Sequence, residues 1–170
     1  MAECRWIDAC AVCRVGNMIF VTVGGQLPFD RLVDGVSDLA CRLDEPIRAQ
    51  TLRERQWTGL RSCHSMTREA YLRCFSEARL IIGHAGIGTF LTARDRKKPL
   101  ILVPRRAALR EHRSDHQMDT AHALETCEGV SIAWTVPEIE DLIDTELRPV
   151  GPPSPHYARL LSTVRDLVSG

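Results

Sequence analysis

The chain lacks a net charge. Its 170 residues include 22 basic and 22 acidic side chains, so the formal charge at pH 7 is zero. A protein without an excess of one sign has no overall field that would draw it to nucleic acid or to an anionic membrane. We therefore expect no nucleic-acid partner. The cluster of Arg105, Arg106, Arg110 and Arg113 leaves room only for a local basic patch.

Long apolar runs are missing as well. The longest ones have the length of a β-strand, far below the roughly 20 apolar residues that a membrane-spanning helix needs. The N-terminal residues also lack the continuous apolar stretch of a secretory signal. We therefore expect a cytoplasmic protein.

The seven cysteines lack a regular pattern. An odd number of scattered cysteines favours reduced thiols in the cytoplasm over a disulfide framework. Cys10 and Cys13 form a single C-x-x-C pair, and no second pair lies at the spacing of a zinc site. Cys4 alone does not replace that pair, so we expect no metal at this end of the chain.

What the chain does contain is an alternation of short apolar runs with segments of helical periodicity. The runs predict strands over residues 18–23, 47–52, 60–64, 80–83, 100–103 and 130–133. The second of them alternates apolar and polar residues, so we expect a more exposed strand there. The central runs are continuously apolar, which is typical of a parallel sheet covered on both faces. The predicted fold is α/β, a Rossmann-like parallel sheet with helices on both faces.

Turn and capping residues mark where the helices between these strands begin. Pro28 suits the first position of a helix. Thr67 and Asp115 suit the position that caps a helix N-terminus. Pro137 opens another helix, and a further one begins near Gly86.

The two ends of the chain differ from this pattern. Residues 1–17 show no period, and Met18 begins the first β-branched strand, so we expect a leader that is disordered or precedes the native start. The domain then covers residues 18–170. After the Pro-rich segment Arg148–Pro155, residues 155–169 predict a C-terminal helix with a long apolar stripe. That stripe can pack on its own sheet or dock on a partner, and the sequence leaves both open.

The segment His84–Thr89, HAGIGT, lies where a buried strand meets a helix. Open parallel sheets bind ligands beyond the carboxyl ends of their strands. A helix beginning at Gly86 offers unpaired N–H groups and the positive end of its dipole. Glycines at 86 and 88 let a phosphate approach the backbone, and Thr89 adds a hydroxyl. The alternative is that the glycines only permit a tight turn, and a short G-x-G leaves both interpretations open.

His84 stands at the strand exit, directly after a glycine. It can act as a general base, or it can brace the turn by hydrogen bonding, and its position favours the second role.

A second polar segment, Glu111–Gln117, follows the next strand and so lies at the same edge of the sheet. Glu111, His112 and His116 do not form the H-E-x-x-H pattern of a zinc site, and we expect no metal there. Gln117 carries an amide that both donates and accepts hydrogen bonds, which suits sugar hydroxyls.

Taken together, these segments resemble the C-terminal domain of family 28 glycosyltransferases. That family has a strand, then H-A-G-x-G-T, then K-P with an apolar strand and proline, then a His-Gln pair that opens a helix. Here these are HAGIGT (His84–Thr89), KPLILVP (Lys98–Pro104) and DHQ (Asp115–Gln117). The stretch Met18–Leu32, MIFVTVGGQLPFDRL, is similar to the start of the free-standing members. The resemblance covers residues 18 to about 147.

The resemblance implies the fold of the C-terminal half of a GT-B glycosyltransferase and a donor site in its cleft. The glycine turn would hold the donor diphosphate, Gln117 the sugar, and Gly24 with Gly25 another wall. Thr92 stands where full-length members usually carry a glutamate that contacts the ribose, so here it would make a weaker contact or simply pack. The implied donor-binding residues are Gly24, Gly25, His84, Gly86, Gly88, Thr89, Thr92, His116 and Gln117.

The resemblance also implies a function. The segment PRRAALREHRSDHQ is most similar to the PssE type of bacterial exopolysaccharide glycosyltransferase subunits. Such a subunit would bind a UDP-sugar and act on a polyprenyl-diphosphate-linked acceptor. It would do so with a membrane-associated acceptor-binding subunit that recruits it to the inner face of the membrane. It would need no cofactor and would be inactive alone.

Two questions stay open at this point. No residue stands out as the catalytic base, and Arg105, Arg106 and Arg110 are available either for an acidic donor sugar or for a lipid phosphate. The alternative function is a non-catalytic nucleotide-sugar-binding module with a regulatory or assembly role.

Overall fold

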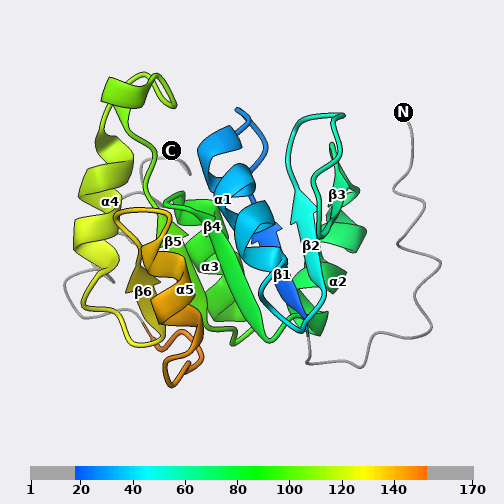
Figure 1. Ribbon diagram of the computed structural model, residues 1–170. Coiled ribbons are helices and arrows are strands. Elements are labelled where there is room, and N and C mark those ends of the chain that lie inside the picture. The colour runs from blue at the N-terminus through cyan, green and yellow to red at the C-terminus, as the bar shows by residue number, and fades with distance from the viewer. Residues whose placement is uncertain (1–17, 153–170) are drawn as a thin grey trace.

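The computed structural model describes residues 18–152. The expected leader (1–17) and C-terminal helix (155–169) lie outside the described residues. Six strands form a single parallel sheet in the order β3-β2-β1-β4-β5-β6 (Figure 1). The strands are β1 (Ile19–Thr22), β2 (Ile47–Gln50), β3 (Leu60–Cys63), β4 (Leu80–His84), β5 (Leu100–Val103) and β6 (Val130–Ile132).

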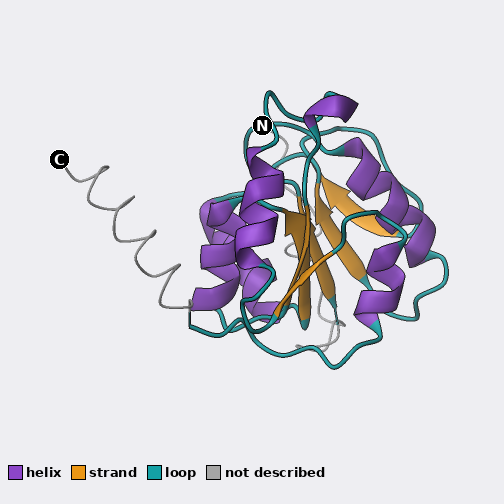
Figure 2. Cartoon of the chain, turned by 90° about the vertical axis from the view of Figure 1, so that its left-hand side faces the viewer, coloured by secondary structure: helices purple, strands orange, loops and turns teal. Residues whose placement is uncertain are grey.

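A helix follows every strand except β2, and helices cover both faces of the sheet (Figure 2). They are α1 (Asp30–Ala40), α2 (Arg68–Glu77), α3 (Ile87–Asp95), α4 (His116–Leu124), α5 (Glu138–Ile143) and a 3-10 turn, η1 (Ala107–Leu109). The predicted Rossmann-like α/β fold is confirmed. No helix within residues 18–152 has the length and apolar character needed to cross a membrane.

Each face of the sheet has its own apolar core, because successive side chains of a strand point to opposite faces. Val21 contributes to the core that α1 and α5 cover. Its neighbour Phe20 contributes to the core that α2, α3 and α4 cover. All four residues of β1 are buried, which explains why the central strands are apolar at every position.

The expectation of an exposed strand at residues 47–52 was wrong. All four residues of β2 are buried, because the strand lies inside the sheet between β3 and β1. Its two polar side chains are paired. Arg48 donates to a Glu77 carboxylate oxygen at 2.8 Å, and Gln50 bonds to Thr22 and Gly24. The alternating pattern therefore reflects partnered polar groups and not exposure to solvent.

Helix starts follow the predicted residues in part. Thr67 caps α2 as expected, since its hydroxyl oxygen accepts from the Ala70 N–H at 3.2 Å. Asp115 precedes α4 but does not cap it, because its carboxylate accepts from the Ala107 N–H at 2.8 Å. Helix α1 begins at Asp30, so Pro28 lies just before its first turn.

The strand order creates a switch point between β1 and β4. From β1 the sheet grows in one direction through β2 and β3, and in the other through β4, β5 and β6. Thr22 at the end of β1 is in register with Gln50 of β2 and with Gly83 of β4. Loops that leave adjacent strands at such a point diverge and open a crevice, where open α/β sheets bind ligands.

Candidate functional site

Two of the glycines at the switch point make room for a histidine. A Cβ atom on Gly24 would lie 2.5 Å from His84 Cε1, and a Cβ atom on Gly86 would lie 2.2 Å from His84 Nε2. Gly24 also has a φ of +80°, which side-chain-bearing residues rarely adopt. The imidazole of His84 therefore lies between the loop after β1 and the loop after β4, and each loop needs glycine there.

Gly25 and Gly88, the other two glycines of these loops, do not make room for a side chain. A Cβ atom on Gly25 or Gly88 would meet no heavy atom within 4 Å, so the space above both is open. Gly86 is the residue before the first turn of α3, and the N–H groups of Ile87 and Gly88 donate to no group within residues 18–152. Unpaired N–H groups at the positive end of a helix dipole form a site for an anion. Packing accounts for Gly86, whereas Gly88 leaves that site accessible.

His84 is held in its neutral form. Burial lowers its pKa to about 4, with a further contribution from the positive charge of Arg105, while a hydrogen bond with the Thr22 backbone opposes the shift. Its Nδ1 lies 3.4 Å from the Thr89 hydroxyl oxygen. Thr89 itself is only 3% exposed, so its hydroxyl is turned inward beside His84 and away from the open side of the turn. These contacts fit the role of a brace between the two loops.

The loop after β1 is anchored by a glutamine that the sequence did not single out. Gln50 of β2 donates from Nε2 to the Gly24 carbonyl at 2.9 Å and accepts from the Thr22 hydroxyl at 2.9 Å. The Thr22 hydroxyl oxygen in turn accepts from the Gly24 N–H at 3.2 Å. An outward-facing residue in an exposed strand could not do this, so the wrong expectation for β2 also concealed Gln50.

Gln117 lies at the site with one half of its amide already engaged. It is 4% exposed, and its Oε1 accepts from the backbone N–H of Arg105 at 3.2 Å. The side-chain oxygen thus already accepts one hydrogen bond from the protein, whereas the NH₂ group donates to no group within residues 18–152. The NH₂ group is therefore the more available half of the amide for a ligand.

Two further predicted residues lie beside the site. His116 is exposed, its Nδ1 lies 2.8 Å from the Ser114 hydroxyl, and its ring packs edge-on against His112. The Thr92 hydroxyl donates to the Gly88 carbonyl at 2.8 Å, one turn back along α3. Thr92 thus stabilises the turn that carries Gly88.

A pocket opens at this edge of the sheet. Three of the predicted residues line it: Gly25, His84 and Gln117. Five others were not predicted as site residues: Val23, Gln26, Leu27, Arg105 and His112. The sequence left Arg105 available for an acidic sugar or a lipid phosphate. In the structure it is 2% exposed and its guanidinium donates to backbone carbonyls. The only signal for it in the sequence is its place directly after a buried strand and a proline.

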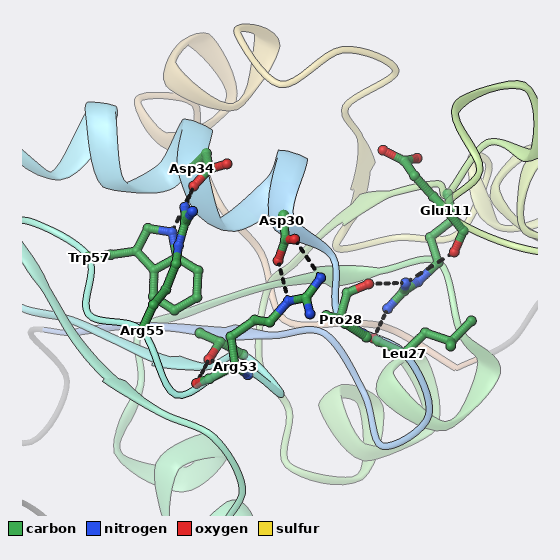
Figure 3. A network of polar contacts seen from close by, with 10 residues as sticks. Leu27, Pro28, Asp30, Asp34, Arg53, Arg55, Trp57 and Glu111 are labelled. Atoms are coloured by element: carbon green, nitrogen blue, oxygen red, sulfur yellow. Dashed lines mark hydrogen bonds and ion pairs between the residues drawn. The ribbon is translucent and has the colours of Figure 1, made fainter.

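The start of α1 is fastened to the connection between β2 and β3 (Figure 3). Asp30 accepts two hydrogen bonds from Arg53, at 2.8 and 3.1 Å. One turn on, Asp34 accepts from Arg55 and, at 2.8 Å, from the Trp57 indole N–H. Exposed ion pairs contribute little stability each, but together these contacts connect the first turns of α1 to the segment between β2 and β3.

Comparison with known proteins agrees with this geometry. The sequence model of the glycosyltransferase family 28 C-terminal domain matches residues 18–148. The chain belongs to this family. A comparison with curated proteins found no match.

Solved structures show where this family 28 domain stands among known folds. The NMR structure of ALG13 is 18% identical with a TM-score of 0.58, over 86% of this chain and 95% of that one. MurG from Acinetobacter baumannii is 19% identical with a TM-score of 0.57, over 84% of this chain and 44% of that one.

The glycotransferase of kitacinnamycin is 13% identical with a TM-score of 0.53, over 75% of this chain and 34% of that one. The family 28 chain thus spans nearly all of ALG13 but less than half of the other two. Its fold is that of the C-terminal half of GT-B glycosyltransferases.

Proposed function

We propose that this family 28 domain binds a UDP-sugar and acts as the donor subunit of a two-chain glycosyltransferase. The observation that carries the proposal is the N-terminus of α3. There two N–H groups are unpaired within residues 18–152, and Gly88 leaves the space above them open. Gly25 leaves the same kind of space on the loop of the neighbouring strand. The diphosphate would lie against these two backbones, because neither glycine presents a side chain.

The chemistry of the site suits glycosyl transfer. Negative charge develops on the diphosphate as the sugar leaves, and preorganised N–H groups at a helix N-terminus stabilise it. The NH₂ group of Gln117 would donate to a sugar hydroxyl. His84, neutral and enclosed by two glycines, would hold the loops and take no proton.

Two comparisons support a second chain. ALG13 is covered along 95% of its length by this one domain, whereas MurG contains a comparable domain as 44% of a longer chain. The described residues form one sheet-based lobe, and a GT-B cleft lies between two. We propose that a membrane-associated subunit supplies the acceptor lobe and presents a polyprenyl-diphosphate-linked acceptor. The segment PRRAALREHRSDHQ, 104–117, favours the PssE type of bacterial exopolysaccharide synthesis.

Reconstitution tests this assignment. The purified full chain would be incubated with labelled UDP-sugars and polyprenyl-diphosphate-linked acceptors, alone and with a membrane fraction that contains the acceptor-binding subunit. We expect transfer only in the combined sample. Efficient transfer by the chain alone would exclude the two-chain assignment. UDP-sugar binding without transfer under any combination would instead favour the non-catalytic nucleotide-sugar module.

A further inference from the structure

The residue after β5 and Pro104 is a buried arginine with an unusual set of partners. Arg105 is among the largest fully buried side chains, with 2% exposure. Its NH2 group donates to the carbonyls of Val23 at 2.8 Å and Leu27 at 2.6 Å. Its NH1 group donates to the carbonyls of Pro28 at 2.7 Å and Glu111 at 3.3 Å. Three of these four carbonyls belong to the loop between β1 and α1.

Burial of a guanidinium against carbonyls alone is unfavourable, because a buried charge is normally paired with an opposite charge. Burial lowers the pKa of Arg105 to about 10, and the nearby charge of Glu111 only partly offsets the shift. The carboxylate of Glu111 bonds instead to Arg31 and to the Arg106 N–H. The hydrogen bonds to the four carbonyls are what offset the cost of burial, and three of these carbonyls belong to one loop.

Arg105 connects the two sides of the pocket. Its guanidinium lies 4.7 Å from the ring centroid of Phe29, the residue before α1. Its backbone N–H donates to Gln117 Oε1 on α4 at 3.2 Å. Figure 3 labels three of the residues whose carbonyls accept from the guanidinium: Leu27, Pro28 and Glu111.

The loop that Arg105 holds has few bonds of its own. The N–H groups of Gly25, Gln26 and Leu27 donate to no acceptor within residues 18–152. Gly25, Gln26 and Leu27 also line the pocket, together with Gln117. Two other side chains also bond to this loop, both at Gly24: Gln50 donates to its carbonyl, and the Thr22 hydroxyl oxygen accepts from its N–H.

We propose that Arg105 is a positioning residue of the pocket: it holds the loop of residues 23–28 in the shape that receives the ligand and ties that loop to Gln117. When a loop is already ordered before the ligand binds, binding does not include the free-energy cost of ordering it. The ligand in question rests on the proposed function, whereas the ordering of the loop does not.

Three variants of the full chain test this inference. Arg105→Met removes the fork, and Arg105→Lys leaves one ammonium that satisfies only some of the four carbonyls. Arg48→Met is the matched control, because Arg48 is likewise buried, at 4% exposure, but bonds to Glu77 of α2. For each, ¹⁵N relaxation would measure the backbone order of residues 24–27, and calorimetry the Kd for UDP, at a temperature where the variant is folded.

In Arg105→Met we expect backbone order parameters of residues 24–27 below about 0.6, the flexible range, and a Kd raised at least about tenfold. The loop order parameters and the Kd of Arg105→Lys should lie between those of the wild type and Arg105→Met. Arg48→Met should lose stability while loop order and Kd stay at wild-type values. If Arg105→Met does not fold, Arg105→Lys is the deciding variant. Lower loop order and a higher Kd than in the wild type would support the proposal, and wild-type loop order and Kd would contradict it.

Wild-type loop order in Arg105→Met would overturn the proposal, as would equal loss of affinity in both methionine variants. If the wild-type chain does not bind UDP at all, the proposed function fails. The loop order of the Arg105 variants then decides the positioning role by itself.

Discussion

At the residue scale, the four glycines of the two loops have two different functions. Gly24 and Gly86 leave room for the His84 imidazole, whereas Gly25 and Gly88 leave space that nothing within residues 18–152 fills. The sequence predicted a glycine turn at the end of a buried strand, and the structure has one. The sequence alone could not show which glycines accommodate His84 and which leave open space. The direction of the His84 ring depends on a loop 60 residues away along the chain.

His84 should make the stability of the domain depend on pH. Its pKa in the folded state is about 4, below its ordinary value of 6.5. As the pH falls below 6.5 the unfolded state takes up the proton first, so the free energy of unfolding falls and levels off only below about pH 4. The full effect is up to about 3 kcal/mol, since one pKa unit corresponds to about 1.4 kcal/mol.

Urea unfolding at pH 7.5 and pH 4.5 measures this effect. His84→Asn cannot take up the proton, so its stability should fall less between the two pH values than that of the wild type. An identical fall in both proteins would show that another group carries the pH dependence.

Gln117 should distinguish a sugar nucleotide from the nucleotide alone. Its free NH₂ group would bond only to the sugar, so Gln117→Ala should weaken UDP-sugar binding about fivefold more than UDP binding, as expected for about 1 kcal/mol from one hydrogen bond. Calorimetry with both ligands gives the ratio. An equal loss for both would mean that Gln117 acts through Arg105, whose N–H it accepts.

At the scale of elements, the sequence predicted correctly those features that depend on interactions between residues close together in the chain. Thr67 caps α2 because its hydroxyl reaches an N–H three residues on. Thr67→Ala should lower the free energy of unfolding by about 1 kcal/mol. Thr126→Ala, at an exposed position after α4, serves as the control and should change it little. Chemical denaturation measures both, and equal values would show that the cap adds no stability.

The sequence failed where long-range order decides. β2 is buried because it lies between β1 and β3. The residues of a strand do not by themselves predict which strands lie beside it in the sheet. Asp115 accepts from Ala107 across a loop and leaves the start of α4 uncapped by a side chain. Arg105 follows the same rule, since its loop partners lie 77 to 82 residues away.

At the scale of the whole molecule, the described domain is one lobe with its site at an open edge. The switch point between β1 and β4 brings the two glycine loops together, and the loop after β5 closes the pocket from the side. In the proposed function such a lobe binds the donor, and a separate subunit supplies the acceptor. That proposal predicts that binding and transfer separate, with UDP binding by the isolated chain and transfer only with a partner.

The most direct test of this account is the affinity for UDP of the Gly88→Val variant, measured by calorimetry. A Cβ atom at this position would meet no heavy atom within 4 Å, and valine is a better helix residue than glycine, so the variant should fold. Its side chain would fill the space above the N-terminus of α3. Asp95→Val, at the other end of the same helix, is the matched control. The account predicts that the Kd rises at least tenfold, or about 1.4 kcal/mol, in Gly88→Val and stays unchanged in Asp95→Val. A wild-type Kd in a folded Gly88→Val protein would contradict it.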